Sequence, residues 1–113
     1  MSESTAIHAL ESLFQFAERG IVSKTLYETP ALKLVLMCFE PGQGLSEHTA
    51  PFEAVVQVLQ GKADFLLGAE TREVKPGDLF VMAPGLKHAV TAKERFVFLL
   101  SMVRGGAPVG IQH

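Results

Sequence analysis

The stretch GLSEHTAPFEAVVQVLQG, residues 44–61, decides the fold that the sequence predicts. It holds His48, an Ala50-Pro51 corner, a strongly apolar run and a closing Gly61. Because proline cannot donate a hydrogen bond to a β-ladder, the corner separates two predicted strands. A second stretch, GDLFVMAPGLKHA at residues 77–89, places His88 just after a Pro-Gly turn. Both stretches therefore predict short strands joined by tight corners, with a histidine in each.

The rest of the chain from residue 21 onward has the same texture. Short apolar or alternating runs are broken by glycine, proline or charge about every eight to twelve positions, which is the pattern of a β-sandwich or barrel. The prolines of this region fall between the runs, as the missing N–H requires. We predict nine strands, at residues 21–27, 33–39, 45–49, 54–60, 63–67, 71–74, 79–82, 87–91 and 95–103.

The two ends of the chain are different. Apolar residues in 4–19 fall near helical spacing, which suits a short helix that stops at Gly20, although the alternating phenylalanines also suit an extended segment. Residues 104–113 contain glycine and proline and are interpreted as an irregular tail. At 113 residues the chain is predicted to be one domain, residues 1–113, with an N-terminal segment over 1–20 and a core barrel over about 21–103.

Composition limits the classes of function. Charged residues make up 19 % of the chain and the net charge is −2, so no basic surface for nucleic acid is expected. No positive segment precedes an apolar run at the N-terminus, and no run reaches the roughly 18–20 residues that span a bilayer. We therefore expect a cytoplasmic protein with no nucleic-acid or membrane partner. Cys38 lies in an apolar run and is interpreted as a buried, inert thiol, and three methionines as core filler: Met37, Met82 and Met102.

Three predicted strands are apolar on both faces, at residues 32–39, 54–59 and 96–103. A strand with one face in water should alternate between apolar and polar residues. These strands therefore need a second cover, and we expect it from both the N-terminal segment and a second copy of the chain. The sequence thus predicts a homodimer.

The two opening stretches resemble the two sequence motifs of the cupin superfamily, G-x5-H-x-H-x(3,4)-E-x6-G and G-x5-P-x-G-x2-H-x3-N. The matching residues are His48 and Gly61 in the first motif and Gly77, Gly85 and His88 in the second. The resemblance implies an all-β fold, the double-stranded β-helix or jelly-roll barrel of small single-domain cupins of the cupin 2 type, with a short helical or extended N-terminal segment.

In cupins the histidines and glutamate of the first motif, with the histidine of the second, commonly hold one metal ion. The resemblance therefore implies His48 and His88 as ligands of a divalent transition metal, which would be iron, manganese, nickel, zinc or copper. Ala50 and Ala54 stand where the motif has its second histidine and its glutamate. Glu53 is a candidate third ligand, although it lies one position from the motif glutamate and strand side chains alternate in direction.

Two classes of function remain open. A bound metal favours an enzyme, for example an oxygenase, isomerase or decarboxylase, that acts on a small polar molecule. The incomplete ligand set favours a non-catalytic cupin that binds a small-molecule ligand as a sensor or accessory protein. In both cases we predict that the His48 and His88 side chains converge across the barrel mouth, because inward side chains at matching height on strands about 4.8 Å apart meet.

Overall fold

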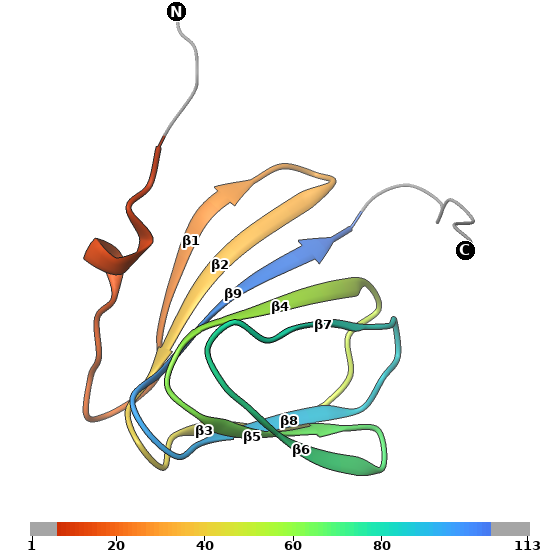
Figure 1. Cartoon of the computed structure of the whole chain (residues 1–113). Helices are drawn as coiled ribbons and strands as arrows, with labels where there is room; N and C mark the ends of the chain where they lie inside the picture. Colours follow the sequence, from red (N-terminus) through yellow and green to blue (C-terminus); the bar gives the residue numbers. More distant parts are fainter. Residues whose placement is uncertain (1–6, 105–113) are drawn as a thin grey trace, which may run out of the picture.

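The computed structural model describes residues 7–104, which form two antiparallel sheets facing one another (Figure 1). All nine predicted strands are present and each boundary lies within one residue of its predicted place. The predicted tail lies outside the described residues, apart from Arg104. Within the described part, no helix is long and apolar enough to cross a membrane. The strands are β1 (Val22–Glu28), β2 (Leu32–Phe39), β3 (Gly44–His48), β4 (Glu53–Gln60), β5 (Ala63–Leu67), β6 (Glu70–Val74), β7 (Leu79–Met82), β8 (His88–Ala92) and β9 (Phe96–Val103).

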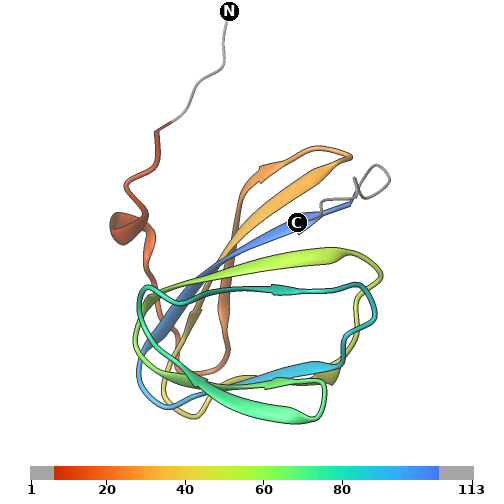
Figure 2. The same ribbon diagram turned by 45° about the vertical axis from the view of Figure 1, so that its right-hand side comes forward.

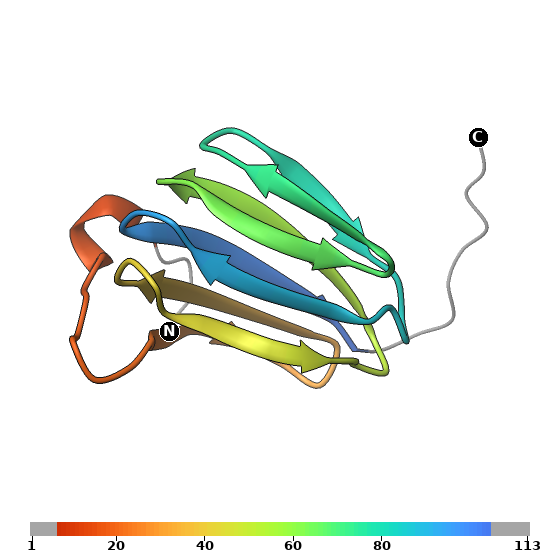
Figure 3. The ribbon, with the colours of Figure 1, turned by 90° about the horizontal axis from the view of Figure 1, so that it is seen from below.

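The chain passes back and forth between the two sheets. The five-stranded sheet has the order β1-β2-β9-β4-β7 and the four-stranded sheet has the order β3-β8-β5-β6. Figure 2 shows the sheets as opposite walls of a barrel, and Figure 3 shows the four-stranded sheet from below. Sheets that exchange strands in this way form a double-sheet jelly roll, which confirms the predicted all-β fold class.

Phenylalanine rings fill one end of the barrel. Phe39 pairs in register with Phe96, at the end of the β2–β9 ladder away from Met102. Phe65 and Phe98 complete the cluster, with neighbouring ring centroids 5.6–6.4 Å apart and exposed fractions of 3 % or less. Burial of such large apolar side chains is the main favourable term in folding. Toward the opposite end the sheets enclose a cavity, which three alanines help to line: Ala50, Ala54 and Ala83.

The N-terminal segment is less helical than predicted. A single 3-10 turn, η1 (Leu10–Leu13), has no side-chain hydrogen bond at its N-cap and buries none of its residues. The chain then continues without a helix, because the side chains after η1 pack on the outside of the five-stranded sheet rather than along a helix face. They cover a buried cluster that includes Cys38, which is 0 % exposed as predicted. The covering residues are Leu13, Phe14 and Phe16, and the cluster is Leu36, Cys38 and Val97.

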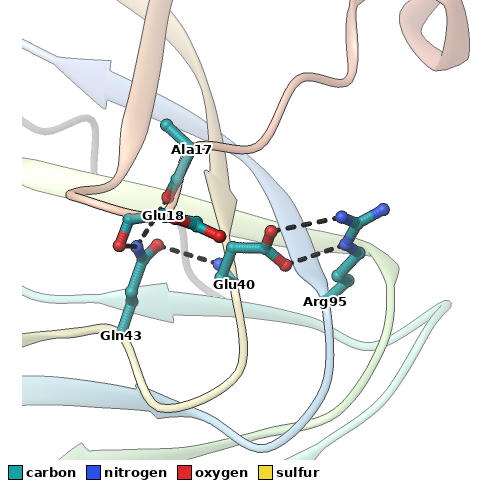
Figure 4. A network of polar contacts seen from close by, with 5 residues as sticks. All are labelled: Ala17, Glu18, Glu40, Gln43 and Arg95. Carbon is teal, nitrogen blue, oxygen red and sulfur yellow. Dashed lines mark hydrogen bonds and ion pairs between the residues drawn. The ribbon is translucent and has the colours of Figure 1, made fainter.

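A polar network fastens this segment to the barrel (Figure 4). Gln43 donates from Nε2 to the Ala17 carbonyl at 2.8 Å and accepts at Oε1 from the Glu40 amide at 2.8 Å. The Arg95 guanidinium donates to both carboxylate oxygens of Glu40, at 2.8 and 3.1 Å, and lies 4.8 Å from the ring centroid of Phe16. The hydrogen bond from Arg95 holds the pKa of Glu40 below its usual value. The N-terminal segment was one of the two covers expected for strands that are apolar on both faces, and its packing on the five-stranded sheet confirms that expectation.

Candidate functional site

A β-bulge in β3 sets the direction of His48. Leu45 pairs with Val90 and His48 pairs with His88, so three steps along β3 match two steps along β8. Without the extra residue, side chains three positions apart would point to opposite faces of the strand. With it, His48 faces the barrel interior together with Leu45, which packs on the core. The bulge therefore brings both motif histidines to one face of the four-stranded sheet.

The two imidazoles lie together, as predicted, with ring centroids 4.2 Å apart and ring planes at 65°. Nδ1 of His48 is 2.7 Å from the Ser46 carbonyl oxygen, and Nδ1 of His88 is 2.8 Å from the Leu86 carbonyl oxygen. A carbonyl oxygen can only accept a hydrogen bond, so in the neutral rings each Nδ1 carries the hydrogen. Each Nε2 then keeps its lone pair. The backbone contacts thus leave one Nε2 acceptor on each of two neighbouring rings.

Two cavities, of about 90 and 50 Å³, meet at this histidine pair. By this measure the larger has room for several water molecules or one small ligand. Apart from the imidazoles, the walls are apolar or carry thioether sulfur. The larger cavity is lined by His48, Ala50, Phe52, Ala54, Met82, Ala83, His88, Leu100 and Met102. The smaller shares His48, Met82, His88 and Leu100 and adds Met37, Leu45, Phe65, Ala89, Val90 and Phe98.

The wall opposite the histidines comes from the five-stranded sheet. Ala54 of β4 pairs with Met82 of β7 on one side and with Met102 of β9 on the other. Side chains paired across strands point to the same face, so the three form one inward row. The position of the motif glutamate is therefore flanked by two methionines that the sequence alone assigned to the core. Only the register of three strands distant in sequence reveals their place.

The two carboxylates next to motif positions lie outside both cavities. Glu47, within the bulge, is exposed, and its carboxylate is 3.4 Å from Lys87 Nζ. Glu53 is exposed at the start of β4, opposite Val103. Across residues 7–104, no three histidine, cysteine, aspartate or glutamate side chains come together as a metal group. Glu53 as third ligand stays a prediction that no contact in the structure supports.

The structure is a jelly-roll barrel with a cavity between its two sheets and a histidine pair on the cavity wall. Comparison with known proteins identifies the family of this barrel. The family model described as a cupin domain matches residues 35–102. The chain therefore belongs to the cupin family. No curated protein matches it.

Solved structures agree with this assignment. A conserved protein of unknown function from Streptococcus pyogenes is 29 % identical, with a TM-score of 0.81 over 94 % of this chain and 93 % of that one. KdgF from a Halomonas species is 26 % identical, with a TM-score of 0.77 over 90 % and 96 % of the two chains. A cupin 2 conserved barrel domain protein from Leptotrichia buccalis is 35 % identical, with a TM-score of 0.79 over 85 % of this chain and 47 % of that one.

The residues present fit the metal site of cupins only in part. With metal–nitrogen bonds of about 2.1 Å, two imidazoles at a right angle around one ion have ring centroids about 4.5 Å apart. The observed separation of 4.2 Å is close to this. Histidine ligands also usually donate their other ring N–H to a carbonyl or carboxylate, as both do here. The carboxylate and the third imidazole, however, are replaced by Ala54 and Ala50.

Proposed function

We propose that this cupin binds one small molecule or ion in the pocket between its sheets, held jointly by Nε2 of His48 and Nε2 of His88. The observations that carry the proposal are the 4.2 Å separation of the two ring centroids and the hydrogen bonds from both Nδ1 atoms to backbone carbonyls, which leave each Nε2 with its lone pair. His48 is exposed and His88 is half-buried, so a ligand can reach both rings from solvent. A ligand shared by the two rings pairs with both nitrogens.

The pocket supports two kinds of occupant, which correspond to two functions. The apolar walls favour a non-catalytic binding protein, whose ligand donates a hydrogen bond to the imidazoles and packs its carbon skeleton against Phe52 and Leu100. The ring separation suits a transition-metal ion shared by both imidazoles, and a divalent ion there would act as a Lewis acid in an enzyme for a small polar molecule. Ala50 and Ala54 then leave space beside the ion for that molecule.

His48→Ala and His88→Ala are each expected to abolish retention of the ligand, because one imidazole is a weak monodentate partner. Elemental analysis of protein purified without a metal-affinity tag, together with thermal-shift titrations of ions, measures the loss. Since His48 is exposed and His88 half-buried, both variants should remain folded. His8→Ala, which removes an exposed histidine outside the site, is the matched control. Retention of a wild-type ligand by both site variants contradicts the proposal.

We propose in addition that two copies of the chain associate through the outer face of the five-stranded sheet. The N-terminal segment covers only one end of this face. The uncovered end, here called the outer patch, has Leu79 and Val81 exposed by 61 % and 53 %. By ladder register the apolar and uncharged residues of the outer patch are Leu34, Val55, Gln57, Leu79, Val81, Leu99, Ser101 and Val103. Tyr27, opposite Leu34, and Glu53, opposite Val103, lie at its edge on the same face. An exposed apolar surface of this kind is typical of an interface.

The polar residues of the outer patch suit a second copy of the same chain. Gln57 lies between Leu99 and Leu79, and Ser101 lies between Leu34 and Val55. Amide and hydroxyl groups both donate and accept, so each can pair with its own copy across a two-fold axis. Because neither is charged, two facing patches do not repel one another at these positions.

The variant Leu79→Lys/Val81→Lys is expected to be monomeric, because a two-fold axis places each new ammonium group near its copy in an apolar interface. Light scattering coupled to size exclusion, at micromolar concentration, should give a dimer for the wild type and a monomer for the variant. Thr71→Lys, on the exposed β6 of the other sheet, should remain a dimer. A monomeric wild type contradicts the proposed assembly.

A further inference from the structure

The side-chain donors on the walls of the larger cavity are of two kinds. They are the imidazole nitrogens of His48 and His88 and the thioether sulfurs of Met82 and Met102. Among the lining residues there is no carboxylate, hydroxyl or side-chain amide. An ion that enters this cavity therefore meets neutral nitrogen and sulfur, and no oxygen from a side chain.

Both methionines line the same cavity as the two histidines, on the wall that faces them. They flank Ala54 on both sides in the inward row, where the motif would supply its carboxylate. Met82 lines both cavities that meet at the histidines. Methionine has three rotatable bonds beyond its backbone, so its sulfur can adjust to an ion. Where the cupin motif has one hard oxygen ligand, this inward row therefore carries two soft sulfur donors, those of Met82 and Met102.

Donor chemistry selects the ion. Magnesium, calcium and manganese prefer carboxylate, carbonyl and water oxygen, whereas thioether and thiolate sulfur select monovalent copper. All four donors are neutral in the form that binds, and the walls around them are apolar. Burial of a charge in such surroundings is costly. Because a monovalent ion carries less charge than a divalent ion, its burial in this cavity costs less free energy.

We propose that this pocket is a Cu(I) site in which Nε2 of His48 and His88 and Sδ of Met82 and Met102 are the ligands. The proposal rests on the proposed function, that both imidazoles hold one ligand, and names that ligand's chemistry. Met37, a further thioether, lines only the smaller cavity. Cys38 is also a soft donor, but it is 0 % exposed and belongs to the cluster outside the barrel. It does not compete for an ion in the cavity.

The test is an anaerobic competition of Cu(I) between the full chain and a chromophoric Cu(I) chelator. The wild type should bind one ion per chain. Met82→Leu/Met102→Leu keeps the volume of both side chains, so it should fold and should lose the sulfur ligands alone. Its Cu(I) affinity is expected to fall at least about tenfold, since even outer partners of metal ligands contribute that much. Zn(II) affinity, which imidazole alone supports, should change little.

A control variant isolates the thioethers. Cys38→Ser changes a soft donor of the cluster outside the barrel, and it is expected to bind Cu(I) like the wild type. X-ray absorption at the copper edge should show nitrogen and sulfur neighbours in wild type and nitrogen alone in the double methionine variant.

The outcomes separate this inference from the proposed function. Equal Cu(I) affinity in wild type and Met82→Leu/Met102→Leu overturns the thioether ligands, while binding that still requires His48 and His88 leaves the proposed function intact. Copper that is lost with Cys38→Ser, or no Cu(I) binding by the wild type, also overturns the inference. Should the double variant fail to fold, Met102→Leu alone, at a half-buried position, gives the same comparison.

Discussion

The variant Ala50→His/Ala54→Glu is expected to gain a tight site for one divalent transition ion. Both alanines already line the larger cavity beside the histidine pair, so the new side chains complete a set of three imidazoles and one carboxylate. The Ala50 carbonyl accepts a 2.8 Å hydrogen bond from the Gly85 amide, which fixes the corner that would carry the new histidine. At an ion concentration a thousand times the Kd, binding should raise the free energy of unfolding by about 4 kcal/mol.

Calorimetric titration and thermal melts with manganese, iron, nickel and zinc measure this gain. Ala50→His/Ala54→Gln is the matched control, because it adds the same volume without the carboxylate charge. The carboxylate should also turn the preference of the site away from Cu(I) and toward divalent ions. A double variant that binds divalent ions no more tightly than wild type would show that the cavity does not correspond to the motif's metal position.

The strands were predictable because their signals are local. A strand needs only a few residues of apolar or alternating pattern, and the glycine and proline corners between strands have their own backbone preferences. Both ends of each of the nine strands accordingly lie within one residue of the prediction. The N-terminal helix was predicted too long because the contacts of Phe14 and Phe16 with the outside of the barrel decide that segment, and these contacts are not visible in local spacing.

The candidate site was predictable only where a motif marks it. His48 and His88 follow from the motif positions, and their convergence follows from inward-facing strands. The bulge in β3 could not be predicted from the sequence, because no residue type between Leu45 and His48 indicates that one residue there is unpaired. The row of Met82, Ala54 and Met102 depends on pairings between segments that are distant along the chain. Pairings of that kind are fixed by the assembled core.

Gly61→Ala is expected to be the most destabilising of the alanine substitutions at glycine corners. Gly61 turns the chain between β4 and β5 with φ of +77°, a conformation that costs an L-residue about 1–2 kcal/mol. A Cβ there would also overlap the Arg95 carbonyl oxygen and lie 2.9 Å from its carbon. These are backbone atoms of the adjoining corner, so they cannot rotate away. With overpacking at about 1–3 kcal/mol, the total is about 2–5 kcal/mol, a large part of a small domain's stability.

Two other glycines separate the contributions of conformation and crowding. Gly77 has φ of +93°, but an added Cβ would meet nothing within 4 Å, so Gly77→Ala should cost only the conformational part, about 1–2 kcal/mol. Gly20 has neither a positive φ nor a close neighbour, so Gly20→Ala should change stability little. Urea denaturation of the three variants, compared at equal m-value, gives the order. If Gly61→Ala lowers the free energy of unfolding no more than Gly77→Ala does, the backbone at Arg95 must shift easily to make room for the new methyl group. The corner between β4 and β5 would then be less tightly packed than its contacts indicate.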